Sequence, residues 1–357
     1  MPHLLVDISA HGFGHLGQTA PVLNALAAAA PRLEVTARSL LPAERLRRAI
    51  EIPFRHVHAA SDFGYVMNNA IDLDLAATAQ RYRSFHEDWN PRVAAEAAWL
   101  AAQRFDAVLS NIAYLPLAGA RRAGIPAFAL SSIHWADLFE HNFGSESWSA
   151  AILDEMFSAY AGAQTFLRLT PGLPMDRLPN RQVIGPVCRM RRPDRPAMAH
   201  RLEIDPGERW VLVVMGGMDF PIDLARWPRL TGTRYLVPRK LCVARSDVTC
   251  FSSLELDFTC LLASADAVIT KPGYATFVEA ACHARPVLYM PREHWAEAAF
   301  LTRWLRENTR AQAIERAKLM KGDLAEALER LLEQPMPPTP APAGIEQAAG
   351  ALARRIA

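Results

Sequence analysis

Short apolar runs that alternate with longer helical stretches constrain the fold of this chain more than any other feature. The runs are rich in Val, Ile and Leu, and their apolar residues are continuous rather than spaced at every second position. In the first half they cover residues 3–8, 33–37, 54–58, 106–110 and 127–130, and helical stretches cover 21–30, 73–103 (broken near Pro91, which cannot continue a helix) and 115–123. Continuous apolar strands separated by helices are typical of a parallel sheet buried between two helical layers. The sequence therefore predicts a doubly wound α/β fold.

The same alternation restarts after residues 186–201, a segment rich in proline and arginine. Strands are expected at 210–215, 267–270 and 287–290, and helices at 257–263, 276–283, 296–308, 323–333 and 345–356. Prolines stiffen linkers, so an interdomain linker is favoured over a basic patch for an anionic partner. We expect a first domain over 1–188, a linker over 189–208, a second domain over 209–334, and a proline-rich spacer with a tail helix over 335–357. The tail helix is a candidate to pack back on the first domain.

Composition excludes several classes of protein. The 39 Lys and Arg against 37 Asp and Glu give a net charge of +2, without the basic excess that nucleic-acid binding needs. No apolar run is long enough to span a membrane, and the start of the chain does not resemble a signal peptide. Five cysteines without a CxxC spacing are expected to be free thiols in a cytoplasmic protein. Peripheral contact with a membrane stays open.

A glycine-rich loop at residues 9–17 (SAHGFGHLG) follows the first expected strand. Its glycines have the GxGxxG spacing, but Arg38 stands near the place where a redox-dinucleotide site has an acidic residue. His11 and His15 flank the glycines. A zinc pair would need a helix here, whereas a histidine at the mouth of a parallel sheet suits general-base catalysis, because its pKa lies near neutrality. For each histidine, a role in orienting the loop is the alternative.

A second loop, at residues 269–276 (ITKPGYAT), leads from a strand through a Pro-Gly turn into a helix. The start of a helix offers free N–H groups to an anion, and Lys271 adds a positive charge. Glu279 lies about one turn into that helix, where its carboxylate can accept hydrogen bonds from a ribose diol or serve as an acidic residue favoured by the helix dipole. Asp72 and Asp74 have the Asp-x-Asp spacing of a metal site, but they open an expected helix and are interpreted as caps. No metal site is predicted.

Residues 271–280 (KPGYATFVEA) and 284–291 (ARPVLYMP) resemble the donor-binding segment of GT-B glycosyltransferases. The pattern is similar to that of MurG-type N-acetylglucosaminyltransferases and of the glycosyltransferase-like region of L-arabinokinases. Residues 12–15 (GFGH) resemble the Gly-x-Gly-His loop of this superfamily, and residues 215–218 (MGGM) resemble its glycine turn. Residues 292–297 continue the similarity into the loop that faces the donor sugar.

This resemblance implies a GT-B fold, in which two Rossmann-like domains face each other across a cleft. It implies transfer of a sugar from a nucleotide diphosphate sugar, most of all a UDP-sugar, to a hydroxyl without a metal or other cofactor. His15, with His11 beside it, would be the base. The residues implied in nucleotide-sugar binding are Gly14, Gly216, Gly217, Lys271, Gly273, Tyr274, Ala275, Thr276, Glu279, Arg292 and Glu297.

The acceptor, a small molecule or a lipid-linked sugar, is expected to contact loops at 62–69 and 131–143. The second of these follows a strand end, where open α/β sheets bind ligands, and it offers His134 and Trp135. Trp135 can stack on a sugar or pack in the core. The chain also differs from its relatives. Gln18 stands where many have Arg or Pro, and Glu297 and Ala298 stand where MurG-type enzymes have a pair of glutamines, so the donor sugar is not specified. A hydrolase or epimerase on the same scaffold, or a silent nucleotide-sugar-binding module, are the alternatives.

Overall fold

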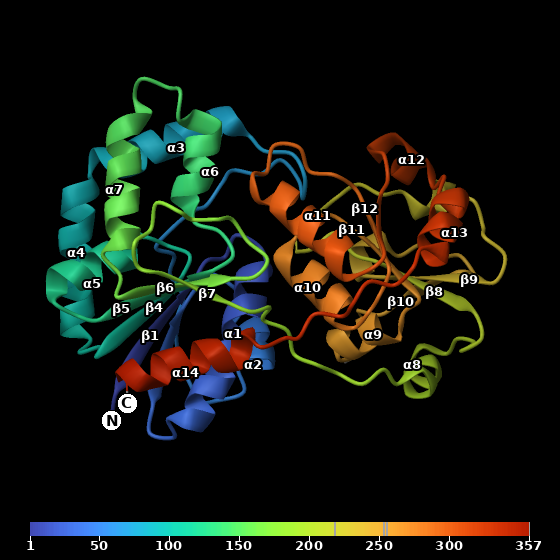
Figure 1. The fold of residues 1–357 in the computed structure, drawn as a ribbon, viewed down its shortest axis with the longest axis horizontal. Helices are drawn as coiled ribbons and strands as arrows, with labels where there is room; N and C mark the ends of the chain where they lie inside the picture. Colours follow the sequence, from blue (N-terminus) through green and yellow to red (C-terminus); the bar gives the residue numbers. More distant parts are fainter. Residues whose placement is uncertain (218, 253, 255, 357) are drawn as a thin grey trace.

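The computed structural model describes residues 1–217, 219–252, 254 and 256–356. Met218 of the expected glycine turn and residue 357 of the expected tail lie outside the described residues. The chain forms two parallel sheets, each enclosed by helices, which lie side by side (Figure 1). No helix among the described residues is long and apolar enough to cross a membrane.

The first sheet has seven strands in the order β3-β2-β1-β4-β5-β6-β7, and all of its pairs are parallel. Its strands are β1 (His3–Ile8), β2 (Glu34–Arg38), β3 (Arg55–Val57), β4 (Ala107–Asn111), β5 (Ala127–Ser131), β6 (Thr165–Leu169) and β7 (Arg181–Ile184). Its helices are α1 (Gly14–Ala29), α2 (Ala43–Ala49), α3 (Leu75–Glu87), α4 (Trp89–Ala102), α5 (Leu115–Ala123), α6 (Trp135–Phe143) and α7 (Ser149–Ala161). The strand order reverses between β1 and β4, and open α/β sheets bind ligands at such a point.

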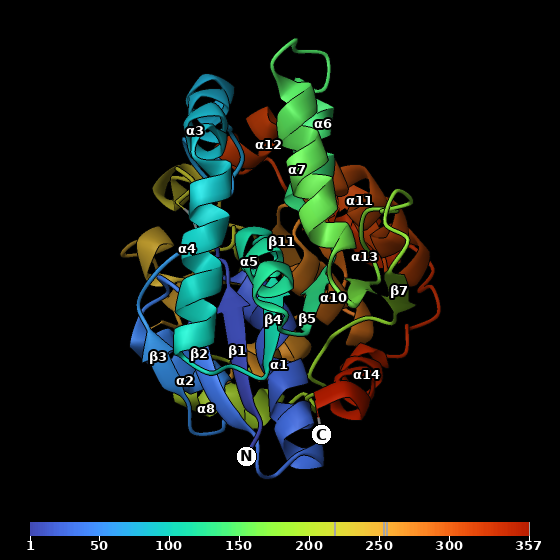
Figure 2. The same cartoon turned by 90° about the vertical axis from the view of Figure 1, so that its left-hand side faces the viewer.

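Both faces of this sheet are buried, as the continuous apolar strands predict. Leu4 and Val6 of β1 belong to an apolar cluster with α1, whereas Leu5 between them packs in a second cluster with α4 and α5. The alternation follows from the strand itself, since successive side chains point to opposite faces. Figure 2 shows α4, α5 and α7 in front of the sheet, on the side opposite α1.

The second sheet has six parallel strands in the order β10-β9-β8-β11-β12-β13. Its strands are β8 (Arg209–Val213), β9 (Thr233–Val237), β10 (Val248–Cys250), β11 (Ala267–Thr270), β12 (Val287–Tyr289) and β13 (Ala311–Ala313). Its helices are α8 (Arg195–Leu202), α9 (Phe258–Ser264), α10 (Tyr274–Cys282), α11 (Glu297–Asn308), α12 (Arg316–Lys321) and α13 (Ala325–Glu333). The order reverses between β8 and β11, so this sheet has a ligand-binding point of the same kind as the first.

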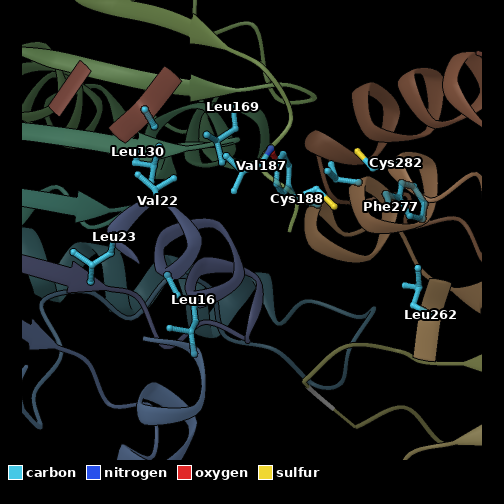
Figure 3. Packing of buried hydrophobic residues seen from close by; sticks show 14 of the residues in the cluster. Leu16, Val22, Leu23, Leu130, Leu169, Val187, Cys188, Leu262, Phe277 and Cys282 are labelled. Carbon is cyan, nitrogen blue, oxygen red and sulfur yellow. The ribbon is translucent and has the colours of Figure 1, made fainter. Parts of the chain in front are cut away.

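One apolar cluster runs through the linker from the first domain into the second. Val187 and Cys188 lie between Leu169 of the first sheet and Phe277 of α10 (Figure 3), and all four side chains are buried. The two domains are therefore packed against each other as well as tethered by the chain.

The last helix, α14 (Gly344–Ile356), packs against α1 of the first domain, so both marked ends of the chain lie together (Figures 1 and 2). Its first turn is fixed to the end of β7: the Gly344 N–H donates to the carbonyl of Pro186 (3.0 Å), and the Gly185 N–H donates to Oε1 of Gln347 (2.7 Å). The chain therefore passes between the domains twice.

Removing apolar volume from α14 is expected to destabilise the first domain. Leu352 is fully buried, and a Leu352→Ala variant should lose about 2–5 kcal/mol of unfolding free energy through lost burial and a cavity. Urea unfolding followed by tryptophan fluorescence measures the change. Leu40→Ala, at a leucine that is 46% exposed, is the matched control and should cost less than about 1 kcal/mol. Equal losses in the two variants would contradict the packing role of α14.

The structure confirms the α/β architecture and corrects four local expectations. Residues 135–143 form helix α6 rather than a loop, and residues 195–202 of the linker form α8. The long helical stretch breaks at Asp88 rather than near Pro91, because Pro91 falls in the first turn of α4, where N–H groups have no helical partner to lose. A disulfide joins Cys242 and Cys250, whose Cα atoms are 5.8 Å apart, so the expectation of five free thiols is wrong for this pair.

Candidate functional site

The two glycine-rich loops meet at the boundary between the domains. Gly17 near the start of α1 faces α10, where a Cβ built on it would lie 3.5 Å from Cβ of Ala275. A Cβ built on Gly217 would lie 2.7 Å from the Phe13 ring, so a larger residue at position 217 would require the Phe13 ring to move. A Cβ built on Gly14 would meet no heavy atom within 4 Å, so the first turn of α1 borders open space. Both ligand-binding points therefore come together at this boundary.

His15 is a buried histidine of α1 whose ring is held by the end of β4. Its Nδ1 lies 2.8 Å from Oδ1 of Asn111, and the side chain is 7% exposed. Burial lowers its pKa to about 4, so the imidazole is neutral at physiological pH. No hydrogen bond to Nε2 is found in the described part of the chain. A neutral imidazole with one fixed and one unoccupied nitrogen has the form that a general base needs.

His11 has a different environment. Its Nε2 lies 3.1 Å from the carbonyl oxygen of Tyr65, and its ring is stacked on Trp295 of the second domain, with centroids 5.9 Å apart and planes at 4°. Burial, and then the neighbouring His15, lower its pKa to about 3. Because Nε2 is occupied and the ring is packed between domains, His11 is suited to joining the loop to the second domain.

Two cations lie beside these rings without a carboxylate partner. Lys271 follows β11, and burial followed by repulsion from Arg292 lowers its pKa to about 7. The Arg292 guanidinium carbon lies 3.8 Å from the Trp295 ring centre, and burial lowers its pKa to about 10. The buried Nε of Arg292 has no hydrogen-bond partner, and neither cation forms an ion pair, within the described residues. Glu297 is near enough to raise the pKa of both cations but is bonded to neither in the described part of the chain, so both keep donors that favour a negatively charged ligand.

Two glycines lie close to the ammonium group of Lys271, one after β8 and one after β11. Cβ atoms built on Gly216 and Gly273 would each lie 3.8 Å from its Nζ. Gly273 is the N-cap of α10, and Ala275 and Thr276 lie in the first turn of that helix, whose N–H groups are free for an anion. The arrangement combines a helix N-terminus, a lysine and an arginine at one point.

Glu297 begins α11 and is 4% exposed. Its Oε1 accepts a hydrogen bond from the Ser132 hydroxyl (2.6 Å), and its Oε2 accepts one from Nε1 of Trp295 (3.3 Å). Burial raises its pKa, while both hydrogen bonds and the nearby Arg292 and Lys271 oppose that rise. Glu297 thus joins the second domain to the end of β5 in the first.

Glu279 and Tyr274 lie on α10 but away from the histidines. Glu279 accepts a long hydrogen bond from the Thr259 hydroxyl (3.4 Å), and burial raises its pKa to about 7. The Tyr274 hydroxyl accepts from the N–H of Val187 (2.9 Å) and donates to the carbonyl of Thr170 (3.3 Å). The side chain of Tyr274 therefore anchors the linker, and only its backbone remains for a ligand.

The two residues expected to contact the acceptor, His134 and Trp135, have different surroundings in the structure. His134 is fully buried and caps α6, where its Nδ1 accepts the N–H of Asp137 (3.0 Å), and it is not brought together with the other site residues. Trp135 is also fully buried, but its ring lies 5.3 Å from that of His11 and 5.9 Å from that of His15. Its Nε1 donates to Asp62 (2.7 Å), whose pKa burial raises to about 6. Trp135 therefore supports the histidines from inside the first domain.

A loop of the first domain also reaches across the boundary. The N–H of Ala70 donates to the carbonyl of Asp219 (2.9 Å), and Ala70 and Ile71 are buried in the apolar cluster of the second domain. The Asp72 carboxylate binds the Arg316 guanidinium through two bonds of 3.0 Å. Only Asp74 of the Asp-x-Asp pair is a helix cap, accepting the Ala77 N–H, so the expectation of a cap is wrong for Asp72.

Sequence reasoning did not connect three polar residues with His15. Asn111 and Ser132 come at the carboxyl ends of β4 and β5, and Gln18 lies one turn after His15 on α1. Ser132 and Gln18 were noted for other reasons, as part of the 131–143 loop and as a difference from relatives, whereas Asn111 was missed although it is a polar residue at the end of a buried strand. Trp295 was also missed, because nothing in the sequence indicates that its ring meets His11.

Comparison with known proteins gives one relative by sequence and many by structure. No family model matches the chain. An L-arabinokinase of Arabidopsis thaliana is 23% identical over 341 residues, which is 90% of this chain and 31% of that protein. The chain therefore spans about a third of the length of this curated relative.

Solved structures match over almost the whole chain. The glycotransferase of kitacinnamycin has a TM-score of 0.63 at 16% identity, covering 99% of this chain and 95% of that one. CalG4, the calicheamicin glycosyltransferase, has a TM-score of 0.61 at 15% identity, covering 99% and 94%. MnaA of S. aureus, solved with UDP, has a TM-score of 0.60 at 13% identity, covering 99% and 95%. The chain has the GT-B fold, the two-domain architecture that it shares with these solved structures.

Proposed function

We propose that this protein is a glycosyltransferase that moves a sugar from a nucleotide diphosphate sugar to an acceptor hydroxyl without a metal ion. One observation carries the proposal: a neutral His15 and the unpaired cations Lys271 and Arg292 lie where the switch points of two parallel sheets meet. A base and an anion site on opposite domains are what attack by a hydroxyl and departure of a diphosphate require. The shared fold supports the same conclusion.

In the proposed reaction, the acceptor hydroxyl lies beside Nε2 of His15. Nε2 takes the hydroxyl proton while the oxygen forms a bond to the anomeric carbon of the donor sugar. The bond from that carbon to the diphosphate oxygen breaks, and its electron pair stays with the diphosphate. The added negative charge is stabilised by Lys271, Arg292 and the first N–H groups of α10.

The test is a panel of UDP- and dTDP-sugars with and without small-molecule and lipid-linked acceptors. Release of free nucleoside diphosphate is measured, in the presence and absence of EDTA. We expect release that depends on an acceptor and is unchanged by EDTA. Turnover without any acceptor would contradict the transferase and support a hydrolase or epimerase. Binding without turnover would support a nucleotide-sugar-binding module.

Glu279 is proposed to bind the ribose of the donor through its carboxylate. A Glu279→Gln variant removes the charge, and hydrogen bonds to charged groups are worth about 1.5–3 kcal/mol, so UDP affinity should fall about 10- to 100-fold. Calorimetry with UDP measures this, and pH 8 is the suitable condition because a carboxyl with a pKa of about 7 is mostly ionised there. Glu326→Gln, at an exposed glutamate of α13, should leave the affinity unchanged. Equal affinities in all three proteins would remove Glu279 from the donor site.

A further inference from the structure

A chain of hydrogen bonds between buried side chains crosses the domain boundary from Glu297 to His15. The Ser132 hydroxyl donates to Oε1 of Glu297 (2.6 Å), and Nε2 of Gln18 donates to Oγ of Ser132 (2.9 Å). Nδ2 of Asn111 donates to Oε1 of Gln18 (3.1 Å), and Oδ1 of Asn111 lies 2.8 Å from Nδ1 of His15. All five side chains are at most 7% exposed, so water does not compete for these bonds. We call this set of five residues the relay.

The direction of every bond in the relay follows from its two ends. A carboxylate only accepts, so the Ser132 hydroxyl donates to Glu297 and its oxygen is left to accept from the Gln18 amide. The Gln18 oxygen then accepts from the amide of Asn111, whose own oxygen faces His15. At the other end, Nδ2 of Asn111 also donates to the backbone carbonyl of His15 (3.5 Å), which can only accept. Both ends therefore require the proton of His15 to lie on Nδ1.

We propose that Glu297 acts through the relay as a positioning residue, holding His15 in the tautomer with a proton on Nδ1 and a lone pair on Nε2. This inference rests on the proposed function, since Nε2 is the atom that would take the acceptor proton. A histidine with the opposite tautomer presents an N–H at Nε2 and cannot act as a base there. The hydrogen bonds of the relay thus select the reactive form of His15.

The relay also makes the base depend on the arrangement of the domains. Glu297 belongs to α11 of the second domain, whereas the other four residues belong to the first. The Ser132–Glu297 bond exists only while the two domains are together. Arg292 and Lys271 lie close enough to favour the ionised form of Glu297, so the proposed anion site adjoins the relay at Glu297. His15 is therefore held by the complete relay only when the second domain lies in this position against the first.

Nitrogen NMR of histidine imidazole in ¹⁵N-labelled protein tests the relay directly, because protonated and unprotonated ring nitrogens have separate signals. The His15→Gln spectrum identifies the signals of His15. In the wild type we expect His15 almost wholly as the Nδ1–H tautomer. In Ser132→Ala, and independently in Glu297→Met, which leaves no acceptor for the Ser132 hydroxyl, the tautomer ratio should fall about tenfold, the effect of losing one hydrogen bond of about 1.4 kcal/mol. An unchanged His15 spectrum in both variants overturns the proposal.

Ser264→Ala is the matched control. Ser264 is a buried serine of α9 that donates to the carbonyl of Cys260 (2.8 Å), and it has no bond to the relay. This variant should carry a similar folding cost but leave the His15 tautomer as in the wild type. A tautomer shift in Ser264→Ala as large as in Ser132→Ala would assign the effect to general loosening of the structure and overturn the relay.

Kinetics separates this inference from the proposed function. Ser132→Ala should lower kcat in proportion to the fraction of His15 that remains in the Nδ1–H tautomer, and leave KM for the donor unchanged. Loss of kcat with an unchanged tautomer would overturn the positioning role. If the wild type turns over no nucleotide sugar while both variants shift the tautomer, the proposed function fails and the relay remains.

Discussion

A His15→Gln variant is expected to lose about 10²–10⁴-fold in kcat while binding UDP as tightly as the wild type. Glutamine has no nitrogen that can take a proton at neutral pH, but its amide can still reach Asn111, so the helix and its surroundings are preserved. The expected loss is the contribution of general-base catalysis alone. Steady-state kinetics gives kcat, and calorimetry gives the affinity for UDP.

The control for this variant is His141→Gln, at an exposed histidine of α6, which should leave both quantities unchanged. If His15→Gln keeps the wild-type kcat, His15 is not the base. If it loses UDP binding as well as kcat, His15 contacts the diphosphate instead of the acceptor.

The second large effect is expected at Lys271. A Lys271→Met variant removes a buried cation next to the first turn of α10, and loss of one group that stabilises developing negative charge costs about 10²–10³-fold in rate. We expect this loss in kcat/KM for the donor. Lys318→Met, at an exposed lysine of α12, serves as the control and should be neutral. A Lys271→Met variant with wild-type kcat/KM would place the diphosphate elsewhere.

Lys271 also predicts the pH dependence of the reaction. His15 must be neutral to accept a proton, so kcat/KM rises as the pH increases through the His15 pKa of about 4. Lys271 must be charged to bind the diphosphate, so kcat/KM falls as the pH increases through its pKa of about 7. Ionisation of Glu279, whose pKa is about 7, adds a further rise in kcat/KM on the acid side, so the profile is bell-shaped with its maximum near pH 7. In Lys271→Arg the charge persists to high pH, so the alkaline limb should move upward by more than a unit. An alkaline limb that stays near pH 7 in Lys271→Arg would assign it to another group.

The fold could be predicted from sequence because its central strands carry a local signal. β1, β4, β5 and β11 are continuous apolar runs, and such runs identify parallel strands without knowledge of their neighbours. The edge strand β7 was missed because two of its four residues, Arg181 and Gln182, are polar and leave no continuous apolar run. An edge strand pairs on one side only and is covered less completely than a central strand, so its apolar pattern is a weaker signal for a strand.

The site was predictable only in part, for a different reason. The loops that hold His15 and Lys271 were found because glycines after a strand are a pattern within a short segment. The relay comes from four separate elements: α1, the ends of β4 and β5, and the start of α11. Which of the many serines, asparagines and glutamates of a chain meet depends on the order of the strands and the docking of the domains. No spacing along the sequence records that information.

The return of α14 to the first domain has a consequence for how the protein is made. In the order of synthesis, α14 emerges from the ribosome only after the whole second domain, yet it covers α1, which emerges before that domain. Until then the apolar residues of α1 and β7 that α14 will cover have no permanent partner. The domain that is translated first is thus completed last, and the nascent chain carries an unfinished surface through the synthesis and folding of its neighbour.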